Sequence, residues 1–220
     1  MKRSARESSG AYELSWSIDT VDQPDAAGAA GPALELELEL EALEELYVGD
    51  RLWDYDKSRA RTADREGVYR FVHDGALRLV FARAPSPSNV MPRVVYEPLF
   101  SRVEAGQKHR RRVTLGLPVH EYSSLARDMS EPTSLVEVER VTLILAYRLR
   151  SSMDAAPLPP PLETADAAGY IVHEPKLIVS SLEVDKIPVK RRTGYMARFA
   201  LPGEPKPGPM PLEQPPEQRR

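Results

Sequence analysis

Two runs of basic side chains are the feature of this sequence with the clearest potential chemistry. They comprise Lys108, Arg110, Arg111 and Arg112 in the first run, and Lys190, Arg191 and Arg192 in the second. The whole chain of 220 residues carries a net charge of -3, so the positive charge is concentrated in these runs. Nucleic acid or an anionic lipid surface could bind there, because such contacts release counterions. The runs therefore support one hypothesis, a polyanion-binding module.

The same residues have a plainer interpretation. Lysine and arginine on an edge strand or a turn prevent sheets from aggregating edge to edge. Neither run is interleaved with the aromatic side chains on which single-stranded nucleic acid stacks, and no nucleic-acid-binding motif accompanies them. The sequence therefore argues against a nucleic-acid partner. Membrane insertion is not expected either, because no stretch approaches the roughly twenty apolar residues of a spanning helix.

A row of glutamates provides the opposite charge. Glu35, Glu37, Glu39 and Glu41 alternate with leucines, and in a β-strand all four share one face. That face is either plain solvated surface or it opposes basic residues of a neighbouring strand or partner protein.

Motifs for catalysis or metal binding are incomplete. The sequence has no nucleophile elbow, phosphate-binding glycine loop or dinucleotide fingerprint, and it has no cysteine. The segments "HEYSS" and "HEPKL" lack the second histidine of a zinc-binding helix. The segment "DYDKS" starts like a calcium-binding loop, but Arg59 and Arg65 occupy the places of its glycine and its last glutamate. We therefore predict no catalytic residue, metal or cofactor. A hydrolase whose carboxylates gather only in space is the enzymatic alternative.

Proline-rich segments suggest a protein partner. Pro159, Pro160 and Pro161 could form an extended polyproline segment that an aromatic groove recognises, or simply a stiff loop. The segment "PSPSNVMPR" is a candidate inhibitory loop. Our leading prediction is a non-enzymatic, cytoplasmic protein-interaction module that binds through a sheet edge or these proline-rich segments. It would act as an adaptor, an assembly component or an inhibitor-like binder.

The elements that would position these residues are strands. Residues two apart lie about 200° apart around a helix, so only a strand puts Leu34, Leu36, Leu38 and Leu40 on one face. The run 12–18 alternates in the same way. We predict three hairpins: one returning from the leucine strand to Trp53, one turning at Asp74-Gly75, and one turning at Gly106.

The longest apolar run changes parity. Val136 and Val138 occupy even positions, whereas the apolar residues from Val141 to Leu149 occupy odd ones. The switch at Glu139-Arg140 predicts a β-bulge or a bend, because otherwise the core face would turn outward. The segments 176–184 and 194–201 are predicted to form the last strands of the fold.

Many short strands without a βαβ rhythm predict an all-β fold. We expect an antiparallel β-sandwich of Ig-like or Greek-key type over residues 11–202, with flexible segments near 20–32 and 152–169. Residues 1–10 and the proline-rich residues 203–220 are expected to be disordered tails. The start "MKRSARESSG" is basic, but no apolar run follows it, so we expect a cytoplasmic protein.

Overall fold

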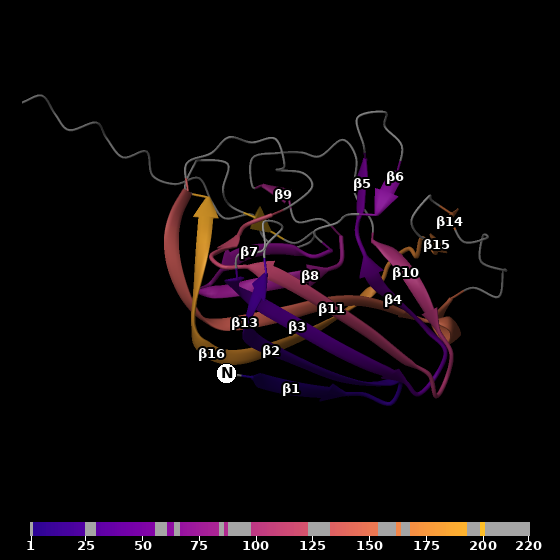
Figure 1. Ribbon diagram of the computed structural model, residues 1–220. Coiled ribbons are helices and arrows are strands. Elements are labelled where there is room, and N and C mark those ends of the chain that lie inside the picture. The colour runs from indigo at the N-terminus through magenta and orange to yellow at the C-terminus, as the bar shows by residue number, and fades with distance from the viewer. Residues whose placement is uncertain are drawn as a thin grey trace, which may run out of the picture.

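The fold is all-β, as the alternation of apolar and polar residues predicted (Figure 1). The structure is a computed structural model. It describes residues 2–24, 30–55, 61–63, 67–83, 86–87, 98–122, 133–153, 162–163, 168–192 and 199–200. Most of these residues belong to two main sheets that pack against each other.

The first sheet has four antiparallel strands in the order β1-β2-β3-β11. Their bounds are Arg3–Ser8 for β1, Tyr12–Pro24 for β2, Ala30–Ala42 for β3 and Lys108–Gly116 for β11. The leucines of β3 are buried and its glutamates are more exposed, which confirms the predicted strand. This sheet therefore has one dry face and one wet face.

The second sheet has seven strands, in the order β10-β4-β13-β16-β12, with β8 beside β13 and β7 beside β8. Their bounds are Leu99–Val103 for β10, Leu46–Arg51 for β4, Thr133–Leu149 for β13, Lys176–Arg192 for β16, Val119–His120 for β12, Ala76–Phe81 for β8 and Tyr69–His73 for β7. The sheet is strongly curved, almost like a barrel (Figure 1).

The prediction of purely antiparallel pairing is wrong for the second sheet. Strand β8 runs parallel to β13, and β12 runs parallel to β16. Parallel pairing is possible here because neither pair is joined by a tight turn.

Three small pairs complete the described elements, together with a short 3-10 turn, η2 (Arg150–Ser152). They are β5 (Trp53–Tyr55) with β6 (Arg61–Ala63), β14 (Leu162–Glu163) with β15 (Ala168–Gly169), and β9 (Ser86–Pro87) with β17 (Phe199–Ala200).

One of the three predicted hairpins is confirmed. Strands β7 and β8 pair across Asp74 and Gly75, whose φ angles are 49° and 72°. Positive φ at both central residues is the requirement of the type I′ turn, and glycine adopts it at little cost.

The other two predicted hairpins are wrong in their pairing. The chain does reverse after β3 and after β10, but each returning strand joins the other sheet. Strand β4 cannot pair with β3, because β2 and β11 already occupy both edges of β3. The two reversals lie against each other: the Gly106 N–H donates to the Ala42 carbonyl at 2.7 Å, and the Ala42 N–H donates to the Gln107 carbonyl at 3.0 Å. We call these two reversals the stacked arches.

The predicted bulge in the longest strand is confirmed. The register of β13 against β16 shifts between Val138 and Arg140. The extra residue lets Val138 and Val141 both face the core between the sheets, although their positions differ in parity.

The expected disorder at the N-terminus is wrong, because Arg3–Ser8 forms β1 along the edge of β2. Ala5 packs against the core, which gives this short strand a buried anchor. The expected flexible segment 20–32 is also largely strand, since β2 continues to Pro24 and β3 begins at Ala30. Residues 203–220, most of 152–169 and Pro159, Pro160 and Pro161 lie outside the described residues. Of the loop "PSPSNVMPR", only Ser86 and Pro87 are described, as the short strand β9.

The main core fills the space between the two sheets, and Trp16 lies in it with 2 % of its surface exposed. Its indole Nε1 donates to Ser180 Oγ at 2.9 Å, and that hydroxyl donates to Glu7 Oε1 at 2.9 Å. This chain of hydrogen bonds links β2, β16 and β1. A second cluster that includes Tyr69 and Phe100 covers the other face of the second sheet.

Candidate functional site

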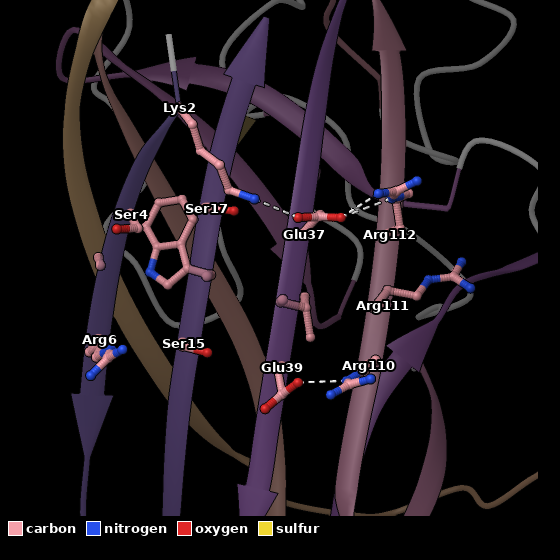
Figure 2. Close-up of a pocket in the computed structure, with 13 residues that line it drawn as sticks. Lys2, Ser4, Arg6, Ser15, Ser17, Glu37, Glu39, Arg110, Arg111 and Arg112 are labelled. Carbon is pink, nitrogen blue, oxygen red and sulfur yellow. Dashed lines mark hydrogen bonds and ion pairs between the residues drawn. The ribbon is translucent and has the colours of Figure 1, made fainter. Parts of the chain in front are cut away.

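The outer face of the first sheet carries a groove with a volume of about 610 Å³ (Figure 2). Its floor contains Ser4, Ser15 and Ser17, and its charged rim consists of Lys2, Arg6, Glu37, Glu39, Arg110 and Arg112. We call it the charged groove. It is hollow because β2 presents short serine side chains between the longer side chains of β1 and β3.

The first basic run lies on this face, on strand β11. Lys108, Arg110 and Arg112 point outward, whereas Arg111 lies on the inner side of the strand and is only partly exposed. The outward cations stand directly opposite Glu41, Glu39 and Glu37 of β3 in the strand register.

The opposed charges form ion pairs. Lys108 Nζ lies 2.8 Å from a carboxylate oxygen of Glu39 and 3.3 Å from one of Glu41. Arg110 Nε contacts Glu39 at 2.5 Å, and Arg112 pairs with Glu37 and, at 3.6 Å, with Glu35. Of the two interpretations of the glutamate row, the structure supports opposition to basic residues of a neighbouring strand. We call these pairs the charge ladder.

Lys2 joins the ladder from the other side. Its Nζ lies 2.8 Å from Glu37 Oε2, so the side chain crosses above β2 (Figure 2). Hydrogen bonds from Lys2 and then from Arg112 lower the pKa of Glu37 to about 2. Hydrogen bonds from Lys108 and Arg110 lower the pKa of Glu39 as well. Both carboxylates are therefore charged at neutral pH.

The lowered pKa of Glu37 predicts that the stability of the protein decreases at acid pH. Its pKa in the folded protein lies below the unfolded value, so its contribution to stability is present above the unfolded pKa and is lost as the pH falls towards about 2. We expect the difference in unfolding free energy between the wild type and Glu37→Gln to shrink over that range. Urea denaturation at several pH values measures it, and an NMR titration of the Glu37 carboxyl with a midpoint near the ordinary glutamate value would contradict it.

The second basic run lies elsewhere. Lys190, Arg191 and Arg192 end strand β16 in the second sheet, so the two runs belong to different sheets. The backbone N–H of Arg192 donates to Glu121 Oε2 at 2.7 Å. Lys190 stands between Leu135 of β13 and His120 of β12.

A buried polar cluster was not predicted from the sequence. Asp50, which is 5 % exposed, accepts a hydrogen bond from Ser101 Oγ at 3.0 Å, and one of its oxygens lies 3.1 Å from His109 Nε2. Arg51 Nη2 donates to the same serine hydroxyl at 3.0 Å. The hydroxyl is bonded to the carboxylate and not to the imidazole, unlike the order in a serine hydrolase triad. The cluster connects β11 of the first sheet to β4 and β10 of the second.

Glu121 is a second buried carboxyl, at 5 % exposure. Its two oxygens accept the backbone N–H groups of Val72 and Arg192, both at 2.7 Å. Burial is the largest effect on its pKa and raises it. In the sequence this residue resembled the start of a zinc helix, but it directly follows strand β12.

Among the described residues, no three histidine or acidic side chains come together in a way that could hold a metal ion. The same part of the chain contains no helix long and apolar enough to cross a membrane. No protein-family model, curated protein or solved structure matches this chain.

Proposed function

We propose that this protein is a non-enzymatic interaction module that binds another protein through the outer face of the first sheet. The observation that carries this proposal is the charge ladder. The cations of β11 are matched by glutamates of β3 yet stay 47–73 % exposed at their side chains. The face therefore offers basic and acidic columns side by side.

This pattern favours a protein partner over a polyanion. A nucleic acid lying along the groove would meet Glu37 and Glu39, which lie between Lys2 and the cations of β11. Protein surfaces carry both signs of charge, and complementary patterns select partners and fix their register. An adaptor, an assembly component or an inhibitor-like binder in the cytoplasm would use such a face.

We also propose that the fold is a β-sandwich of Ig-like or Greek-key type. Two sheets that share one core support an Ig-like or Greek-key sandwich, whereas the curvature of the second sheet favours a partly closed barrel.

A polyanion-binding module remains the second candidate, through the end of β16. At this end of the strand Arg191 is exposed and Lys190 is partly exposed. Binding there would weaken steeply with salt, because counterions are released.

Charge reversal tests the leading proposal. We expect the double variant Arg110→Glu/Arg112→Glu to lose about tenfold in capture of the native partner from a cell extract, a change of about 1.4 kcal/mol. Quantitative mass spectrometry of cross-linked complexes measures the loss. Lys186→Glu on β16 is the matched control, since it also reverses an ion-paired cation but lies in the second sheet.

A compensated variant separates pattern from net charge. Arg110→Glu combined with Glu39→Arg keeps one ion pair and the total charge while it reverses the local pattern. It should lose the partner like the double variant, provided that circular dichroism shows a folded protein. Equal capture by the wild type and both variants would overturn the proposal, as would recovery of nucleic acid alone.

A further inference from the structure

Strand β11 is an edge strand of the first sheet. In the part of the chain that the structure describes, its backbone pairs with β3 only. Every second N–H and C=O of such a strand points away from the sheet, so another strand can add there. The opposite edge strand, β1, contacts β16 of the second sheet. Arg3 Nη2 lies 3.4 Å from Asp185 Oδ1, and the Ser180 hydroxyl donates a hydrogen bond to Glu7.

The charges on β11 repeat with the period of a strand. Lys108, Arg110 and Arg112 have glutamates on their β3 side, and their side chains remain 47 %, 73 % and 64 % exposed. A strand added on the other side would lie next to the same cations. Strand β3 already shows which pattern fits, because its glutamates stand opposite these cations in register.

A second copy of this chain does not fit the edge well. Pairing β11 with another β11 would bring lysine and arginine side chains together, and Lys2 and Arg6 also line the groove at the β1 edge of the sheet. Like charges on directly opposite strands are destabilising. The edge therefore resists self-association and favours a strand of opposite charge.

We propose that β11 binds an extended segment of another protein that carries Asp or Glu at every second residue, as an added strand beside Lys108, Arg110 and Arg112. This inference rests on the proposed function and names the partner's chemistry. Backbone hydrogen bonds would supply affinity, and the alternating carboxylates would fix the register and direction of the segment.

Blocked peptides as long as the nine residues of β11 test the proposal on the unaltered protein. We expect TETETETET to bind about tenfold more tightly than TTTTTEEEE, which has the same composition and charge but cannot match the period of the strand. N-methylation of alternate amides should weaken TETETETET by about tenfold, because it removes backbone donors. The lysine peptide TKTKTKTKT should not bind. Fluorescence anisotropy measures affinity, and NMR shifts of the β11 amides locate the site.

Several outcomes would overturn the inference: equal binding of the two acidic peptides, tolerance of N-methylation, shifts away from β11, or no binding at all. A variant, Arg110→Gln/Arg112→Gln, should weaken TETETETET, whereas Lys186→Gln should not. If the peptides fail while partner capture still depends on Arg110 and Arg112, the proposed function stands and the partner uses the face rather than the edge. If both fail, the proposed function falls as well.

Discussion

Replacing Trp16 with alanine is expected to lower the free energy of unfolding by about 3–5 kcal/mol, the usual range for a large aromatic side chain removed from a core. Trp16 is 2 % exposed and lies between the sheets, so the truncation would leave a cavity. It would also remove the donor to Ser180 Oγ. Urea denaturation followed by circular dichroism measures the loss.

A conservative variant separates the two contributions. Trp16→Phe keeps an aromatic ring but removes the indole N–H, so it should cost less than the alanine variant. Ser180→Ala removes the acceptor and breaks the link to Glu7 as well. An alanine variant that lost less than about 1 kcal/mol would show that the core does not depend on this side chain.

Glu121→Ala is expected to cost about 2–4 kcal/mol, because it leaves two backbone donors, the N–H groups of Val72 and Arg192, without their acceptor. Glu121→Gln should cost less. Its amide oxygen can accept one N–H, while its amide nitrogen cannot accept the other. Urea denaturation of both variants measures these losses.

The pH dependence of this residue has the opposite sign to that of Glu37. Burial raises the pKa of Glu121 in the folded protein, so its ionisation on raising the pH disfavours the folded state. The stability difference between the wild type and Glu121→Ala should therefore be largest below the unfolded pKa and should narrow as the pH rises through the folded one. A stability difference that widened over this pH range would contradict a raised pKa for Glu121.

The local features of the fold were predictable from the sequence because they depend on spacing within one strand. Alternation placed the leucines of β3 inside, Asp74-Gly75 specified its turn, and the parity change located the bulge in β13. Each of these follows from the two-residue period of a strand or from the φ preferences of turn residues.

Pairing between distant strands was not predictable in this way. The glutamate row and the first basic run were both visible, but Lys108 and Glu39 are 69 residues apart and only the register joins them. The cluster around Asp50 depends on the same pairing, since Ser101 lies 51 residues away from it. Strand β1 was missed because its anchor, Ala5, is a single small residue in a polar stretch.

The stacked arches have a consequence for how the chain reaches its fold. The segment that contains β3 and β4 runs beside the segment that contains β10 and β11, and both cross from one sheet to the other at the arches. The pairing of β3 with β11 and that of β4 with β10 therefore meet at Ala42 and Gly106. A slip of one register would displace the other, because only residues 43–45 and 104–107 separate the two pairings. Closing one long loop between these segments therefore sets both registers together. That closure is costly in chain entropy, and contacts so distant in sequence therefore slow folding.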